Sequence, residues 1–138
     1  MWACSRCFLL VNNTSLVLYT KRQRTVEAST YGLELVAARI ETEKVIKVRY
    51  KLKILGRSLE RTSFMVGDNI NAILNTTNPS SMLKKKHNAV VCYRVRETIA
   101  SMDMHFCHLP STANIADVLT KLLKSKILHG LLRQYLYR

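Results

Sequence analysis

Three acidic residues stand among apolar neighbours in this basic chain. Glu34 lies in the apolar opening of an expected helix, Asp68 follows the apolar run 64–67, and Asp117 lies inside the segment 114–121. The whole chain has nine Asp and Glu against 22 Lys and Arg. A carboxylate beside apolar side chains is costly unless a partner compensates its charge. Converging carboxylates repel one another unless a cation lies between them, and oxygen ligands suit Mg²⁺. These residues are therefore candidate ligands of a divalent metal.

Each of the three acids also has a structural explanation. Glu34, in a first helical turn, would interact favourably with the helix dipole. Asp68, between a strand and a helix, would serve as an N-cap. Asn114 and Asp117 have the spacing of a capping box, although such a box prefers Glu or Gln at its last position. Asp68 also follows the carboxyl end of a strand, where α/β folds place ligands. Taken together, the three acids favour the functional interpretation.

Length and composition indicate one folded domain with an anionic partner. The chain has 138 residues, is 48% hydrophobic and carries a formal net charge of +13. Such a charge favours nucleic acid or another anionic surface as partner; a basic protein without a ligand is the alternative. The apolar stretch 7–19 is interrupted by polar residues 12–15, so we expect neither a transmembrane helix nor a signal peptide. The expected location is the cytoplasm or the nucleus.

The four cysteines predict no disulfide framework. The spacing Cys-x2-Cys occurs once, at Cys4 and Cys7, and no second pair matches it. A zinc site would have to be completed by His105, Cys107 and His108. We expect instead buried free thiols in a reducing compartment.

The hydrophobic pattern predicts a hairpin followed by alternating helices and strands. Strands are expected at 8–11, 16–19, 64–67 and 104–109, and helices at 31–55, 70–74, 84–101, from 113 or 114 onward, and at 124–137. Ser29 or Thr30 should cap the long helix, and Gly56 should end it. Its apolar residues form two stripes, which predicts packing on more than one side. The order of the elements implies an α/β protein with a mixed sheet flanked by helices.

Four segments agree in order and spacing with one known family. They are residues 19–38, 67–69, 84–87 and 114–121. From about Phe8 to its end, the chain resembles the C-terminal RNase H domain of copia-type (Ty1/copia) retrotransposon Pol polyproteins. The resemblance implies an RNase H-like sheet flanked by helices, with residues 1–7 as a non-matching segment and 8–138 as the domain. Leu122 is a small departure, since relatives commonly have Pro there.

The resemblance also implies a chemistry. RNase H domains hold two Mg²⁺ ions on four carboxylates at the scissile phosphate of an RNA–DNA hybrid, where the ions activate a water and stabilise the leaving 3′-oxygen. By resemblance, Glu34, Asp68 and Asp117 are three of these catalytic metal ligands. The implied cofactor is Mg²⁺ or Mn²⁺. The implied partners are a hybrid and the reverse transcriptase domain of a parent polyprotein.

The fourth carboxylate of the family is missing from this sequence. In relatives it is an Asp that bridges both ions from a first, central strand, whereas this chain has no acidic residue before Glu27. We therefore expect an N-terminally truncated domain that lacks the central strand and has impaired hydrolysis. A loss of about 4 kcal/mol of transition-state stabilisation lowers a rate roughly a thousandfold. The sequence leaves open whether the chain is an active endoribonuclease.

Basic residues accompany the matching segments. Candidate nucleic-acid ligands are Lys84, Lys85, Lys86, His87, Lys121 and Arg22. Around an acidic crevice they would bind phosphates on both sides of the cut; ordinary solvated faces are the alternative. His108, near the last acid, is a weaker candidate for assisting product release, and we expect it to belong to a strand.

Three functional interpretations follow. The first is an RNase H-like domain derived from a retrotransposon, with metal-dependent hydrolysis as its ancestral reaction. The second is a non-catalytic remnant that binds nucleic acid or docks on reverse transcriptase. The third is a degenerate reading frame without a selected activity.

Overall fold

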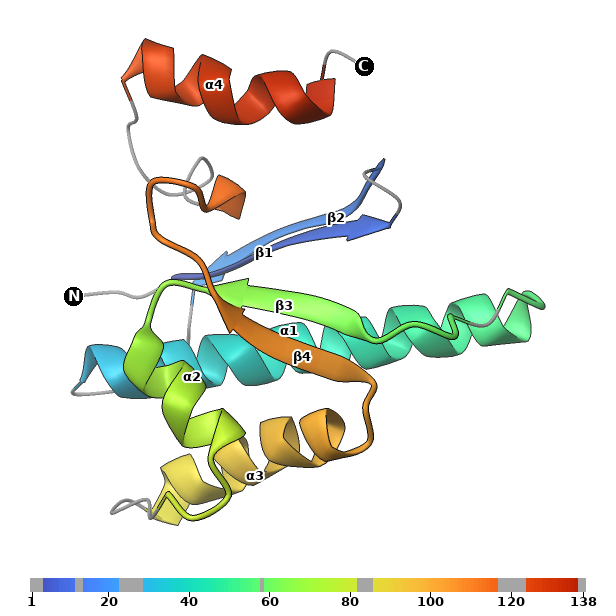
Figure 1. The fold of residues 1–138 in the computed structure, drawn as a ribbon, viewed down its shortest axis with the longest axis vertical. Helices are drawn as coiled ribbons and strands as arrows, with labels where there is room; N and C mark the ends of the chain where they lie inside the picture. Colours follow the sequence, from blue (N-terminus) through green and yellow to red (C-terminus); the bar gives the residue numbers. More distant parts are fainter. Residues whose placement is uncertain are drawn as a thin grey trace. The chain divides into compact units, whose positions relative to one another are not determined.

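A computed structural model describes residues 4–11, 14–22, 29–57, 59–81, 86–116 and 124–136; the side chains of residues 4–6, 22, 87 and 134–136 are not described. The elements are β1 (Cys4–Val11), β2 (Thr14–Arg22), α1 (Thr30–Ile54), β3 (Ser63–Gly67), α2 (Ile70–Thr77), α3 (Lys86–Ala100), β4 (Met104–His108) and α4 (Ser125–Leu136) (Figure 1). They divide between two compact units. Unit 1 comprises residues 1–25 and 109–138, and unit 2 comprises residues 26–108.

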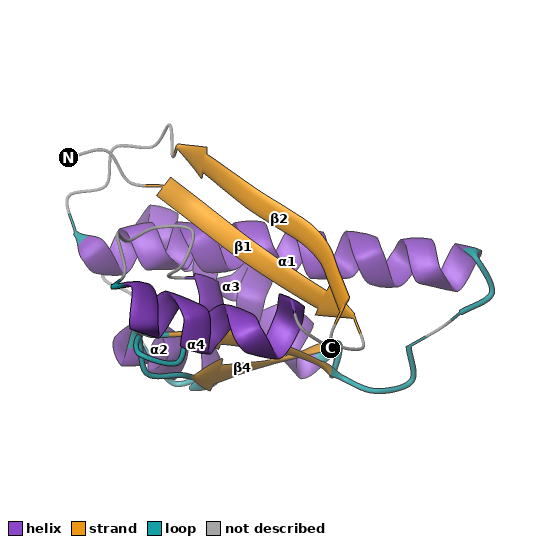
Figure 2. Ribbon diagram, turned by 90° about the horizontal axis from the view of Figure 1, so that it is seen from above, coloured by secondary structure: helices purple, strands orange, loops and turns teal. Residues whose placement is uncertain are grey.

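Unit 1 contains the predicted hairpin and the last helix. β1 and β2 pair antiparallel, with an irregularity between Leu9 and Leu10, and they form the long paired ribbon in Figure 2. The hairpin is confirmed but longer than predicted, since residues 4–7, which we expected to lie outside the domain, pair with residues 19–22. The helix expected at 124–137 is confirmed as α4. Of the helix expected from residue 113 or 114, the described part holds only a helical turn at residues 115 and 116.

In unit 2, β3 and β4 form a parallel pair. Their register runs from Ser63 opposite Met104 to Gly67 opposite His108. Parallel strands need a crossover, and α2 and α3 supply it, since they lie between the two strands in the chain. Met65 is buried, whereas Phe64 is 72% and Val66 43% exposed. The apolar run 64–67 predicts a buried strand, and this prediction is wrong for one side of β3, because alternate side chains face opposite sides of the pair.

Helix α1 begins and ends where the sequence predicts. The Ser29 side chain accepts a hydrogen bond from the Gly32 N–H at 3.2 Å, and Gly56 ends the helix with a φ of +73°. That conformation favours glycine. One stripe of the helix is buried: Gly32, Leu35, Ala38, Thr42 and Val45. The second predicted stripe consists of Ala38, Val45 and Leu52; the first two residues are buried, whereas Leu52 is only partly buried.

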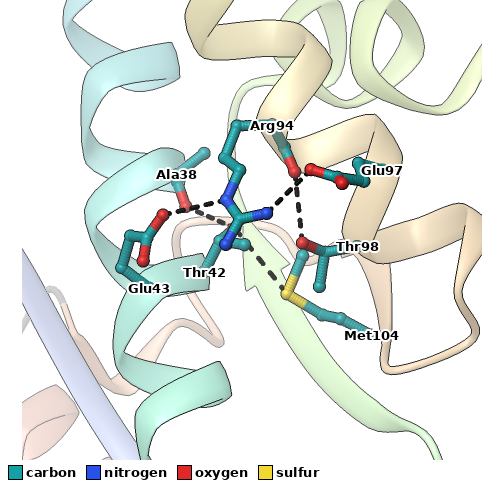
Figure 3. A network of polar contacts seen from close by, with 7 residues as sticks. All are labelled: Ala38, Thr42, Glu43, Arg94, Glu97, Thr98 and Met104. Carbon is teal, nitrogen blue, oxygen red and sulfur yellow. Dashed lines mark hydrogen bonds and ion pairs between the residues drawn. The ribbon is translucent and has the colours of Figure 1, made fainter.

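A polar network joins α1 to α3 and the strands (Figure 3). Arg94 of α3 bonds Glu43 of α1 at 3.0 Å and Glu97 of its own helix at 2.7 Å. Thr42 is fully buried; its hydroxyl donates to the Ala38 carbonyl at 2.8 Å and lies 3.9 Å from the Met104 sulfur. Because the buried hydroxyl has a partner, its burial costs little.

The described strands form two separate two-stranded sheets, one antiparallel and one parallel. The mixed α/β class is therefore confirmed. A single RNase H-like sheet stays a prediction.

Substitution of Gly67 tests how closely the end of β3 packs against Phe106. A Cβ atom at this position would lie 2.9 Å from the Phe106 ring, closer than such atoms approach without a shift. We expect Gly67→Ala to lower the free energy of unfolding by about 1–2 kcal/mol in urea denaturation. Gly130→Ala is the control, since nothing lies within 4 Å of a Cβ there, and this helical substitution should stabilise α4 by up to about 1 kcal/mol. Equal effects of both substitutions would contradict the close packing of Gly67 on Phe106.

Candidate functional site

Asp68 follows β3 directly and is exposed. The structural explanation for Asp68 was that it caps α2, and it does not. Asn69 is the N-cap, and its side-chain oxygen accepts hydrogen bonds from the N–H groups of Asn71 at 3.1 Å and Ala72 at 3.2 Å. Among the described residues, the Asp68 carboxylate has no hydrogen bond or ion pair. The structural explanation for this acid is therefore wrong, and its carboxylate is available to a ligand.

Glu34 lies deeper in α1 than the first turn. The helix begins at Thr30 and has no acidic residue in its first turn. Since the helix dipole acts mainly within that turn, it gives only a weak reason for an acid at position 34. The Glu34 side chain is partly buried, and its charge acts on Glu41, seven residues further along the helix.

The start of α1 and the end of β3 lie on the same side of unit 2, at the left in Figure 1. Glu34 lies in the second turn of α1, and Asp68 follows β3 directly. We call this side of unit 2 the acidic edge, and a meeting of the two carboxylates there stays a prediction. Asp117, the third predicted ligand, lies outside the described residues. Within the part of the chain that the structure describes, no group of three or more His, Cys, Asp or Glu side chains could hold a metal ion.

Glu41 is a carboxyl group that the sequence pattern does not single out. Burial, and then the charge of Glu34, raise the pKa of Glu41 from 4.5 to about 8, while Lys44 acts in the opposite direction. Glu41 is therefore largely protonated at neutral pH. Glu34 and Glu41 are seven residues, or about two helical turns, apart. This spacing alone predicts that they share a helix face. The burial that raises the pKa could not be read from the sequence.

Of the six predicted nucleic-acid ligands, only Lys86 has a described side chain. It is exposed at the start of α3. Lys84, Lys85 and Lys121 lie outside the described residues, as do the side chains of His87 and Arg22. Whether these residues gather around the acidic edge stays a prediction.

The cysteines behave as free thiols where they are described. Cys7 and Cys92 are buried and Cys107 is partly buried, and none forms a disulfide. Burial raises the pKa of Cys92, against the effect of the neighbouring Arg96, so this thiol stays protonated and unreactive. His105 packs against the Phe64 ring, with ring centroids 5.7 Å apart. Among the described side chains, no group of three or more His, Cys, Asp or Glu could form the alternative zinc site.

Comparison with known proteins found no matching family model, no matching curated protein and no matching solved structure. Within the described residues, no helix combines the length and the apolar character that crossing a membrane would require.

The raised pKa of Glu41 predicts a pH-dependent stability. Because the folded protein holds this proton up to about pH 8 and the unfolded chain releases it near its ordinary pKa, stability should fall as the pH rises through this window. The loss should be at most a few kcal/mol, since Glu41 keeps part of its accessible surface and solvent screens its charge. Glu41→Gln should flatten the profile and stabilise the protein most at pH 8 in urea denaturation.

Two further substitutions serve as matched tests of this assignment. Glu34→Gln should flatten the profile in part, because it removes the like charge that raises the pKa of Glu41. Glu60→Gln, at an exposed position, should leave the slope unchanged. A profile that is equally steep with and without Glu41 would contradict the assignment.

Proposed function

We propose that this chain is a retrotransposon-derived RNase H-like domain that binds nucleic acid and holds a divalent cation weakly at its acidic edge. The observation that carries the proposal is Asp68, an exposed carboxylate without a described partner, directly after a strand of a parallel pair. The neighbouring Asn69 takes the capping role. The order of elements, from the hairpin through the long helix to the parallel pair, is also the order that the resemblance implies.

The acidic edge suits a hard cation better than a soft one. Glu34 and Asp68 offer carboxylate oxygens, and Mg²⁺ takes one or two such ligands while it keeps several waters. By resemblance Asp117 would be a third ligand. When bound, the ions would supply an activated water and would stabilise a leaving oxygen. Residues 1–26 contain no acid, so these residues supply no bridging carboxylate of the family type, and we infer that hydrolysis by residues 1–138 alone is impaired.

The charge of the chain supports a polyanionic partner. With a net charge of +13, it should attract nucleic acid over the distance that salt screening permits. Lys86, exposed at the start of α3, is one candidate contact; the five others stay predictions. The partner of this proposal is an RNA–DNA hybrid, in the cytoplasm or the nucleus, with Mg²⁺ or Mn²⁺ as the ion. In a longer polyprotein the domain would adjoin reverse transcriptase.

A non-catalytic remnant is the second candidate function. The absence of an early acid favours it, since the same scaffold would then bind nucleic acid or dock on reverse transcriptase without cutting. A degenerate reading frame would show neither metal binding nor salt-sensitive binding of nucleic acid.

Calorimetric titration with Mg²⁺ and Mn²⁺ tests the metal site. We expect weak binding, on the order of millimolar, because few carboxylates contribute. Asp68→Asn and Glu34→Gln should each weaken it about tenfold or abolish it. Asp103→Asn is the control, since this acid forms an ion pair with Arg49 at 3.2 Å and should affect stability without affecting the ion. Unchanged binding by Asp68→Asn would contradict a cation at the acidic edge.

Incubation with a labelled RNA–DNA hybrid in Mg²⁺ tests the reaction. We expect binding that weakens steeply with salt, because several phosphates are neutralised, and cleavage at least a thousandfold below that of a complete four-carboxylate site. Efficient turnover that Asp68→Asn abolishes would contradict impaired hydrolysis. An affinity that is flat from low to high salt would contradict the nucleic-acid partner.

A further inference from the structure

Helix α1 continues well beyond its last buried residue. This residue is Val45, yet the helix runs to Ile54. Tyr50 is 65% and Ile54 66% exposed. Figure 1 shows this end of α1 projecting past the neighbouring ends of β4 and α3, at the right of the view. Val48 and Leu52 stay partly buried, whereas Tyr50 and Ile54 leave apolar surface exposed in the last two turns of the helix.

The projecting end combines apolar and cationic side chains. Tyr50 and Ile54 are one turn apart and lie on one face. We call them, together with the exposed lysines around them, the α1 ridge: Lys47, Tyr50, Lys51, Lys53 and Ile54. No acidic residue occurs from position 44 to position 59. Among the described residues, the three lysines have no acidic partner, so their charges face solvent uncompensated.

An ion pair and hydrogen bonds of Arg49 hold the C-terminal end of α1 in place. Arg49 forms an ion pair with Asp103 at 3.2 Å and donates to the carbonyls of Arg61 at 2.9 Å and Leu59 at 3.2 Å. These bonds tie the helix end to the segment that leads into β3. A surface held in this way loses little conformational freedom when it binds a ligand, which favours binding.

We propose that the α1 ridge binds single-stranded nucleic acid, with a base stacked on Tyr50 and phosphates against the lysines. An exposed aromatic ring among cations is the combination that single strands use, since every base has a stacking face and the backbone carries the charge. A duplex keeps its bases stacked inside and could use only the lysines.

The proposal rests on nucleic acid as the partner but concerns a second surface, away from the acidic edge. Tyr50 follows Glu34 by 16 residues in the same helix, a rise of about 24 Å. Loss of binding at the α1 ridge should therefore leave binding of a cation at Glu34 and Asp68 unchanged. This difference separates the two sites experimentally.

Fluorescence anisotropy with a labelled oligothymidine of about 15 nucleotides tests the proposal. We expect Tyr50→Ala and Tyr50→Leu to weaken binding about tenfold, because both lose the stacking ring, while Tyr50→Phe keeps the wild-type affinity. Tyr50→Leu keeps an apolar side chain and so controls for lost packing. Lys47→Gln combined with Lys51→Gln should weaken binding and reduce the salt slope by roughly 1.4, the value for two phosphate contacts on a single strand.

A charge-matched variant controls for net charge. Arg39→Gln combined with Arg133→Gln removes the same charge at exposed positions outside the α1 ridge, and it should retain most of the salt slope. Circular dichroism and thermal melting should show all variants folded, since the substituted side chains are exposed.

The outcomes separate this proposal from the proposed function. If the wild-type chain binds hybrid, but Tyr50→Ala and Tyr50→Leu bind oligothymidine as the wild type does, the ridge proposal is overturned and the proposed function stands. Equal losses in the ridge variant and the charge-matched variant would also overturn it. Stronger binding to anionic vesicles or to an acidic peptide than to oligothymidine, lost with Tyr50→Ala, would assign the ridge to another partner and overturn it. If no nucleic acid binds at all, the ridge proposal and the nucleic-acid part of the proposed function both fail.

Discussion

The parallel pairing of β3 with β4 is the constraint on which unit 2 depends. Two parallel strands cannot be joined by a tight turn, so the chain must leave at Gly67 and return at Met104. Met65 and Met104 are buried on the pair, and the Met104 sulfur lies 3.9 Å from the Thr42 hydroxyl of α1. The crossover through α2 and α3 also requires an abrupt change of direction after Gly67, where the backbone packs against the Phe106 ring. Asp68 occupies this change of direction, which is why its carboxylate is exposed beside a rigid strand end.

Arginine and lysine have different structural roles in this basic chain. Arg49, Arg94 and Arg96 each join segments distant in sequence, and Arg96 alone donates to the carbonyls of Asn75, Pro79 and Ser81. The planar guanidinium, with five donors, suits such multiple contacts, whereas a lysine is a compact, strongly hydrated charge. The lysines of the α1 ridge accordingly point to solvent. The arginines thus hold segments of the fold together, and the lysines leave a surface of uncompensated positive charge.

Local signals in the sequence predicted local structure well. The hairpin, both ends of α1 and the strand β4 follow from turn residues, caps and strand formers. Features set by tertiary packing could not be predicted in this way. The choice of Asn69 over Asp68 as cap depends on where β3 ends, and the burial of Glu41 depends on what packs around it. Phe64 is exposed because it lies on the opposite face of β3 from the buried Met65. A short apolar run does not reveal which face of a strand is covered.

The central proposal is that Glu34 and Asp68 share a cation at the acidic edge of unit 2. Crystals grown with Mn²⁺ and measured at the manganese absorption edge test it most directly, because anomalous scattering locates the ion independently of the protein chain. The account predicts an anomalous peak within ligand distance, about 2.0–2.6 Å, of carboxylate oxygens from both residues. A peak at other residues, or no peak at Glu34 and Asp68 under saturating Mn²⁺, would contradict it.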